Sequence, residues 1–179
     1  FMSVYPDVHL AVEYNNAKDI YEKLLRGIID IGVVAVPRRD RNLELFPFEN
    51  EPLVLACAPS HPLAGARTVD IHQLQGEKFI AFSESVPTRH LIDDILNRYH
   101  VTVCSVMDFD NIETIKRAVE INAGVSILPA PTLRSELANG TLRALEFTNE
   151  SFFRPTGIIV RKDKIRSKAA QYLIELLRK

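Results

Sequence analysis

The sequence contains little of what marks several large classes of protein. Cysteine occurs twice, at Cys57 and Cys104, which is too few for a disulfide framework or a four-ligand zinc site. Two buried thiols in a reducing cytosol are the simplest interpretation, with a single disulfide as the alternative. No apolar run approaches the length that crosses a bilayer, so we expect no membrane association.

An excess of charge of one sign is also missing. Lys and Arg number 22 and Asp and Glu number 23, which gives a net charge of -1. A domain that binds phosphates on its own is usually basic, so independent nucleic-acid binding is disfavoured. The first residues, Phe1 to Pro6, lack the basic-then-apolar layout of a signal peptide, and we expect a cytoplasmic location.

The composition is otherwise that of a globular protein. The 179 residues are 46% apolar and 25% charged, which excludes a disordered tail and a coiled coil. A chain of this length can bury roughly 70% of its unfolded surface. It can therefore form one sizeable core or two small lobes.

The first third of the chain predicts a strand, a helix and a second strand. Residues 8–14 alternate between apolar and polar, as in a strand. Asn15 and Asn16 suit a helix cap, and an apolar stripe follows until Gly27 supplies a left-handed stop. Residues 28–36 are apolar and β-branched without alternation, which is typical of a strand covered on both faces in a parallel sheet.

The rest of the chain continues this alternation of short strands and helices. Thr88 is expected to cap a helix over 88–99, and Asp110 or Asn111 the next helix. An α/β fold with mainly parallel sheets follows from the alternation. The other predicted elements are strands at 53–58, 79–82, 101–107, 125–128, 142–147 and 156–160, a short helix or turn at 68–75, a short helix at 132–137, a linker at 151–155 and a last helix from Ser167.

Catalytic and metal-binding motifs are absent. The sequence has no G-x-S-x-G, G-x-G-x-x-G, G-x-x-x-x-G-K-[ST] or H-E-x-x-H, and its five histidines lie singly. Cys57 and Cys104 both fall within predicted strands, which favours buried structural thiols over nucleophiles. The run from Arg38 to Arg41 is interpreted as a solvated turn, with an anion site as the alternative. We therefore expect no enzyme, no metal and no cofactor.

Polar residues gather where predicted strands lead into helices. In open α/β sheets these strand ends line the ligand crevice, and helix N-termini there suit carboxylates or sulfate. Ordinary helix capping is the alternative for each residue taken alone. The residues concerned are Asn15 and Asn16 at the first junction, Ser83, Ser85, Thr88 and Arg89 at a second, and Asp110 and Asn111 at a third.

An ordered set of short motifs resembles the effector-binding domain of LysR-type transcriptional regulators. Each motif is weak alone, but together they cover nearly the whole chain in the family's order. They are Phe1 to Leu10 (F-x-x-x-Y-P-D-V-x-L), Gly27 to Val33 (G-x-l-D-l-a-i), Pro52 to Ala64 with its H-P-L-a ending, Val119 to Pro129 (V-x-x-G-x-G-i-x-l-l-P) and Gly140 to Leu142 (G-x-L).

The resemblance implies a two-lobed fold of the periplasmic-binding-protein type (type 2). Lobe one would comprise residues 1–74 and 153–179 and lobe two residues 75–152, with a small, anionic effector between them and no catalysis. The effector contacts implied by the resemblance and the junctions together are Asn15, Asn16, Ser83, Glu84, Ser85, Thr88, Phe109, Asp110 and Asn111.

The family pattern is not complete in this chain. The first strand and most of the first helix of lobe one are missing, as is the N-terminal winged helix-turn-helix, through which alone DNA would be contacted. Asn122 stands at the first glycine of V-x-x-G-x-G, and Asn tolerates the left-handed conformation; Gly124 is kept. Ala17 replaces a frequent Ser or Thr, which shifts the expected effector contact to Asn16. The resemblance also implies a homodimer, and a tetramer at full length, with the helices over 16–26 and 88–99 at the interface.

Two other functions share such a fold. A solute-binding protein of a transport system would carry a signal peptide. A prephenate-dehydratase-like lyase would carry a catalytic T-R-F run, which Thr88-Arg89-His90 matches in two letters. Sensing of an effector to control transcription is therefore the leading hypothesis.

Overall fold

The structure, a computed structural model, describes residues 1–178 and forms two compact units. Unit 1 comprises residues 1–49 and the chain from Pro155 onward, and unit 2 spans Asn50–Arg154. The sequence-based division placed the first boundary at residue 74. The difference arises because β2 (Leu43–Cys57) passes from unit 1 into unit 2 as one unbroken strand, so no turn marks the boundary in the sequence. Its neighbour β8 (Phe153–Arg161) crosses back in the same way.

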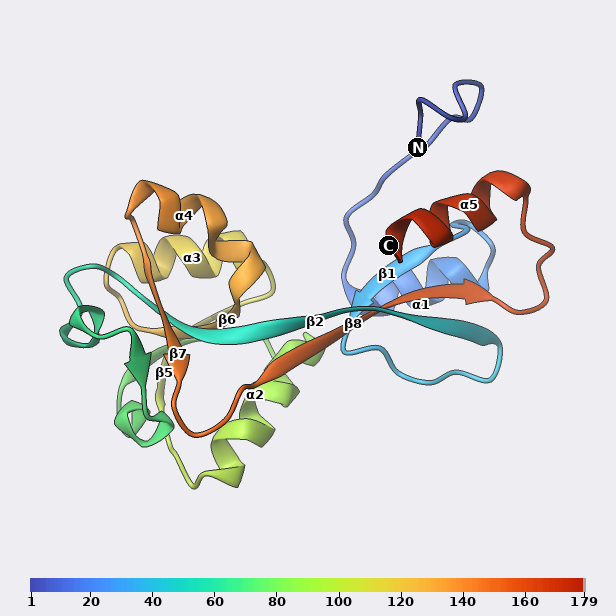
Figure 1. The fold of residues 1–179 in the computed structure, drawn as a ribbon. Helices are drawn as coiled ribbons and strands as arrows, with labels where there is room; N and C mark the ends of the chain where they lie inside the picture. The colour runs from blue at the N-terminus through green and yellow to red at the C-terminus, as the bar shows by residue number, and fades with distance from the viewer. Residues whose placement is uncertain (179) are drawn as a thin grey trace. The chain divides into compact units, whose positions relative to one another are not determined.

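Unit 1 is a small sheet with a helix on each face (Figure 1). Strand β1 (Gly32–Ala35) pairs antiparallel with β8. Helix α1 (Ala17–Leu25) packs on one face through Leu24 and Ile159. Helix α5 (Lys168–Leu177) packs on the other through Ile174 and Ile158. Neighbouring residues of a strand point to opposite faces, which explains how Ile158 and Ile159 reach different helices.

The helix ends of unit 1 are as the sequence predicts. The Asn16 side chain accepts a hydrogen bond from the Asp19 N–H at 2.9 Å and caps α1. Gly27 follows with a φ of 74°, in the left-handed region. Ser167 caps α5 by accepting from the Ala170 N–H. Local capping chemistry decides these ends, so the sequence is sufficient to locate them.

Both strands predicted in the first third need correction. Residues 8–14 form no strand, and Tyr14 is 98% exposed. A strand needs a hydrogen-bonded neighbour, and residues 1–178 provide none for this segment. The second predicted strand shortens to β1, and its partner is antiparallel. Its residues are not covered on both faces either, because Val34 is buried while Val33 is 45% exposed.

Unit 2 combines a parallel strand pair with a larger sheet built on β2. Strands β4 (Lys78–Phe82) and β5 (Cys104–Phe109) run parallel, and a parallel bridge links Phe79 to Val125, just before β6 (Ser126–Pro129). β6 and β7 (Arg143–Phe147) pair antiparallel with β2, and the short β3 (Thr68–Val69) runs parallel to β7. The helices are α2 (Pro87–Arg98), α3 (Ile112–Glu120) and α4 (Arg134–Asn139), with 3-10 turns at Pro62–Gly65, Ile71–Leu74 and Ala130–Leu133.

One apolar core holds unit 2 together. Leu55 of β2, Ile80 of β4 and Ile115 of α3 are all fully buried in it. Gly124 lies so close to β4 that a Cβ at this position would sit 2.6 Å from the Lys78 carbonyl oxygen. Asn122 adopts a φ of 59°, so the left-handed turn predicted before Gly124 is confirmed.

The α/β prediction is confirmed, but the prediction of mainly parallel sheets is wrong. Most pairings are antiparallel, including those of β2 with β6 and β7. An unbroken apolar run indicates burial and carries no information on the direction of the neighbouring strand. The predicted linker at 151–155 is also partly strand, because β8 begins at Phe153.

The two cysteines differ in environment, and neither forms a disulfide. Cys57 is buried in β2, and burial raises the pKa of its thiol to about 11. Cys104 is exposed, contrary to the sequence-based prediction. It begins β5, which has β4 as its one partner in the described part of the chain and is exposed along residues 104–108. Across residues 1–178, no helix has the length and apolarity required to span a bilayer.

Candidate functional site

The candidate site is the edge of unit 2 at which β4 and β5 end. The two strands are parallel, so both C-terminal ends lie on this edge, and the bridge between Phe79 and Val125 adds the end of β6. Residues 83–88 and 130–133 follow β4 and β6 directly, and residues 109–111 contain the last residue of β5 and the two that follow it. The sheet therefore brings together in space three segments that are distant in the sequence.

Ser83 connects the first two segments. Its backbone N–H donates to the Phe109 carbonyl at 2.9 Å, and its hydroxyl donates to Asp108 Oδ2 at 3.0 Å. The Ser83 carbonyl in turn accepts from the Val86 N–H at 2.9 Å. The loop after β4 is thereby fixed to the end of β5.

The other predicted residues of unit 2 lie on the same edge, with different exposure. Glu84 and Ser85 are exposed in the loop before α2, and Phe109 is half-buried. Asp110 and Asn111 are also exposed, and Asn111 caps α3 by accepting from the Glu113 N–H at 2.8 Å. Asn111, rather than Asp110, is thus the cap of this helix.

Thr88 departs from its predicted role. It does not cap α2, because Val86 is the N-cap residue and Pro87 opens the helix. Proline suits that first position because its missing N–H would have no partner there. Thr88 is instead 1% exposed, and its hydroxyl lies 3.5 Å from Arg154 NH1.

Asn15 and Asn16 belong to unit 1. Asn15 Oδ1 accepts from Lys23 Nζ at 2.9 Å, and Asn16 Nδ2 donates to Asp19 Oδ2 at 2.8 Å. Both side chains are thus occupied by local contacts at the start of α1. Their predicted effector contact stays a prediction.

Two arginines also lie near the unit 2 edge. The sequence placed Arg89 at the second junction, whereas Arg154 was not predicted as a site residue. The Arg154 Nε and NH2 both bind Glu51 Oε2, at 2.7 and 2.6 Å, and both side chains are 12% exposed. Arg89 binds both carboxylate oxygens of Asp93 and donates from NH1 to the Phe82 carbonyl at 3.0 Å. Arg154 lay in a predicted linker, and its partner is distant in the sequence, so no local pattern indicated this contact.

A buried ion-pair cluster lies next to this edge, between α3, α4 and the turn after β6. Lys116 of α3 binds Glu136 of α4 at 2.9 Å and Glu113 at 2.8 Å, and it donates to the Thr132 carbonyl at 3.1 Å. The side chains of Lys116 and Glu136 are 5% and 7% exposed. The cluster therefore joins α3 and α4, which lie side by side in Figure 1, to the turn after β6.

Lys116 and the carboxylates it binds stabilise one another in their charged forms. Burial acts to raise the pKa of Glu136, but the hydrogen bond and charge of Lys116 outweigh it and lower this pKa. Burial likewise acts to lower the pKa of Lys116, and the carboxylates of Glu113 and Glu136 raise it. Both groups are thus held in their charged forms.

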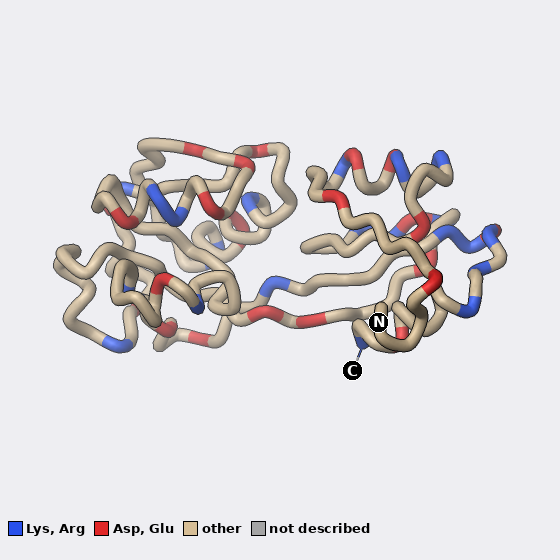
Figure 2. Tube along the Cα trace, turned by 90° about the horizontal axis from the view of Figure 1, so that it is seen from above, with Lys and Arg blue, Asp and Glu red and all other residues tan. Residues whose placement is uncertain are grey.

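Charge at the site edge is mixed. Glu84, Asp108 and Asp110 place carboxylates on it, and the basic groups Arg89, Lys116 and Arg154 each pair with a carboxylate. Figure 2 shows acidic and basic positions interspersed along both units, in keeping with the net charge of -1. An anion bound here would thus need directed donors, such as helix N–H groups or a guanidinium, rather than a general positive field.

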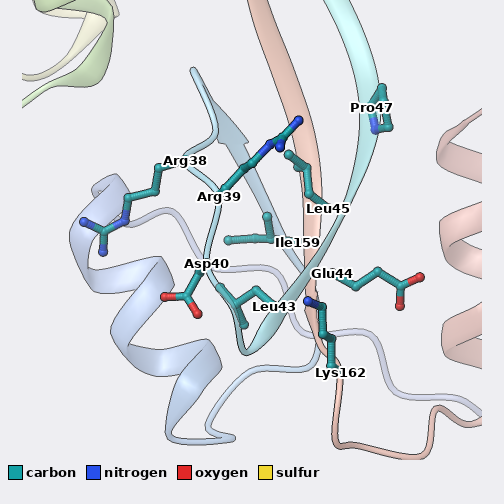
Figure 3. Close-up of a pocket in the computed structure, with 9 residues that line it drawn as sticks. All are labelled: Arg38, Arg39, Asp40, Leu43, Glu44, Leu45, Pro47, Ile159 and Lys162. Atoms are coloured by element: carbon teal, nitrogen blue, oxygen red, sulfur yellow. The ribbon is translucent and has the colours of Figure 1, made fainter.

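A separate pocket of about 440 Å³ lies in unit 1 (Figure 3). Arg38 points away from it toward α1, where its guanidinium lies 4.5 Å from the centre of the Tyr21 ring. Glu44 binds Arg166 at 2.6 Å, and Lys162 donates to the Arg41 carbonyl. The apolar lining consists of Leu43, Leu45, Pro47 and Ile159. Since Arg38, Arg39 and Arg41 are exposed, the solvated-turn interpretation of this run fits the structure.

The arrangement at the unit 2 edge is suited to binding. Helices α2 and α3 both begin there, and their first N–H groups and the adjoining hydroxyl and amide groups can contact a small polar molecule. Among residues 1–178, no cluster of three or more His, Cys, Asp or Glu side chains could hold a metal ion.

Comparison with known proteins identifies the family. The family model described as the LysR substrate binding domain matches residues 1–179. The chain is 27% identical over 156 residues to the HTH-type transcriptional regulator CysL of Bacillus subtilis (strain 168), covering 87% of this chain and 52% of CysL. The chain spans between 47% and 60% of the length of the curated relatives it matches.

Solved structures agree in fold. The CcmR regulatory domain of Synechocystis PCC6803, in complex with 2-PG, matches with a TM-score of 0.88 and 26% identity, over 99% of this chain and 85% of that one. The BenM effector binding domain with its effector benzoate matches with a TM-score of 0.84 and 22% identity, over 99% of this chain and 80% of that one. These matches confirm the periplasmic-binding-protein-like α/β fold.

The family match also confirms the prediction that the chain is not an enzyme, because this family consists of ligand-binding domains of transcriptional regulators. CysL is named as a transcriptional regulator, and the CcmR regulatory domain has the same fold as this chain. The motifs quoted from the sequence had indicated the same family. The chain belongs to the LysR substrate-binding domain family.

Proposed function

We propose that unit 2 binds a small anionic metabolite at the shared C-terminal edge of β4 and β5, and that this binding controls the transcriptional activity of the whole regulator. The observation that carries the proposal is the junction at Ser83, which brings the starts of α2 and α3 to one edge. Two helix N-termini offer N–H donors and the positive ends of two helix dipoles to one ligand.

The solved relatives support the class of ligand. CcmR is in complex with 2-PG, and BenM binds benzoate, a carboxylate. A carboxylate or phosphate accepts several hydrogen bonds at once and suits N–H and hydroxyl donors.

The proposal is tested by thermal shift with a panel of small carboxylates and phosphate esters that includes 2-PG and benzoate. We expect at least one compound to raise the melting temperature of the wild-type chain. Ser83→Ala and Asn111→Ala should weaken its binding, whereas Ser135→Ala, on the exposed surface of α4, should not. No shift across the panel, or a shift that all variants retain, would contradict the proposal.

Three further elements belong to this proposal. DNA would be contacted through a domain outside this chain, the protein would act in the cytosol, and the domains would pair as homodimers through α1 and α2. An oligomeric interface of this kind should bury at least about 1,000 Å². Sedimentation at high micromolar concentration should show a dimer, and a monomer at that concentration would contradict the pairing.

A further inference from the structure

We infer that Arg154 is a specificity-determining residue of the proposed site and that its guanidinium binds the anionic group of the effector. This inference rests on the proposed function and adds a residue that lies outside the junction segments. Arg154 is the second residue of β8 and the last residue of unit 2. Its side chain reaches the first turn of α2, where NH1 lies 3.5 Å from the Thr88 hydroxyl.

The contacts of Arg154 hold the Nε and NH2 side of the guanidinium and leave NH1 with one long contact. Nε and NH2 both donate to a single oxygen, Glu51 Oε2. Within residues 1–178, NH1 has one contact, the Thr88 hydroxyl at 3.5 Å, which is longer than an ordinary hydrogen bond. An arginine carries five N–H donors, so the NH1 side retains donors for a ligand oxygen. Glu51 thus fixes the position of the group without using its full capacity.

The start of α2 adds donors at the same place. Val86 provides no side-chain cap, and Thr88 occupies one of the first positions of the helix, where the N–H has no intrahelical partner. The Thr88 hydroxyl accepts from Arg154, and its own proton has no acceptor within residues 1–178. Because Thr88 is 1% exposed, we assign it the role of a positioning residue that supports Arg154.

The other basic groups near this edge are less suited to the role. Arg89 gives Nε to both oxygens of Asp93 and NH1 to the Phe82 carbonyl. Lys116 is surrounded by Glu113, Glu136 and the Thr132 carbonyl, which together take its three donors. Glu84, Asp108 and Asp110 would repel an anion that met no cation. Arg89 retains an NH2 group without a partner among residues 1–178, but its NH1 is bound to a backbone carbonyl at 3.0 Å. The NH1 group of Arg154 makes only a 3.5 Å contact, with Thr88 in the first turn of α2.

The test measures binding of three probes, 2-PG, benzoate and inorganic phosphate, by calorimetry. We expect Arg154→Gln to lower the affinity for the probe that binds the wild-type chain. The decrease should be about 10-fold to 100-fold, the range for a hydrogen bond to a charged group. Arg98→Gln is the matched control, because Arg98 also pairs with a glutamate, Glu150, but on the surface with 59% of its side chain exposed. It should leave the binding within twofold of wild type.

Two more variants keep the test decisive if Arg154→Gln fails to fold. Arg154→Lys retains the charge but cannot hold Glu51 and a ligand in the same fork geometry, so it should also lose about 10-fold. Thr88→Val keeps the volume and removes the hydroxyl, and it should reduce affinity less than either. The Arg154 side-chain Nε–H resonance, identified by its absence in Arg154→Lys, should shift when the probe binds.

The outcomes separate the two proposals. If Ser83→Ala weakens binding while Arg154→Gln and Arg154→Lys bind within twofold of wild type, the site stands and the role of Arg154 is wrong. If no probe binds the wild-type chain, both proposals are contradicted. Loss of binding in both Arg154 variants with retention in Arg98→Gln supports the inference.

Discussion

Replacing Lys116 by methionine should destabilise unit 2 strongly. The substitution removes the ammonium group that binds Glu136 at 2.9 Å, while methionine retains the length and apolar character of the stem. Glu136 would then remain buried as an isolated carboxylate. Its Oε2 already has no hydrogen-bond partner in the native structure, so the loss of Lys116 leaves little to compensate the charge.

The magnitude follows from burial. Breaking a buried ion pair by removing one partner costs about 3–5 kcal/mol, and the exposures of 5% and 7% place this pair in that class. The lost hydrogen bond to the Thr132 carbonyl adds about 1 kcal/mol. For a chain of this size each kcal/mol lowers the melting temperature by about 2–4 °C, so we expect a decrease of at least about 8 °C.

The pH dependence of the contribution that Glu136 makes to stability should change sign in the Lys116→Met variant. In the wild type the pKa of Glu136 is lowered, so its contribution to stability is present above the unfolded pKa of about 4.3 and is lost as pH falls through the folded pKa. Without Lys116, burial is expected to raise the pKa of Glu136 instead. Protonation then removes the buried charge. Relative to the wild type, the variant should therefore lose less stability at about pH 5 than at about pH 7.5.

Chemical denaturation followed by circular dichroism, at both pH values, checks this reasoning. Arg117→Met is the matched control, because Arg117 also pairs with a glutamate but is 69% exposed, and it should cost much less stability than Lys116→Met. The double variant Lys116→Met/Glu136→Leu should recover most of the loss, since a buried pair can be replaced by apolar groups at little cost. A cost for Lys116→Met no larger than that for Arg117→Met would refute the argument.

Three other predictions concern single positions. A thiol reagent at about pH 8 should label exposed Cys104 in the native chain and leave Cys57, with its pKa of about 11, unmodified; labelling of two thiols without unfolding would contradict this. Gly124→Ala should cost about 1–3 kcal/mol in urea unfolding because its Cβ would lie 2.6 Å from the Lys78 carbonyl oxygen, whereas Gly65→Ala, with no atom within 4 Å of the new Cβ, should be tolerated. Asn111→Ala should cost about 1 kcal/mol through loss of the α3 cap, and an unchanged melting temperature would argue against that cap.

The sequence by itself was sufficient where neighbouring residues decide the structure. Asn16, Asn111 and Ser167 cap the helices that follow them, because each cap is a bond between residues two or three positions apart. Gly27 and Asn122 adopt left-handed conformations for the same local reason. The ordered family motifs also indicated the family that the comparison confirmed.

For the site, the sequence located the junction segments. Ser83 and Asn111 could be selected because both follow predicted strands and precede predicted helices. The parallel pairing of β4 and β5 then places these segments on one edge. The partners of individual side chains could not be predicted, because the bond from Ser83 to Asp108 depends on the register between the two strands.

Tertiary structure alone decided the direction of strands and the burial of charges. The apolar runs show which strands are covered, but strand direction depends on how the connections return, and β6 and β7 came back antiparallel to β2. Residues 8–14 have the alternation of a strand and no neighbour to pair with. The pairs Lys116–Glu136 and Arg154–Glu51 join residues far apart in the chain. Removing water from these charges costs free energy, which is offset only when folding places the partner within hydrogen-bonding distance. No local pattern in a sequence can record that placement.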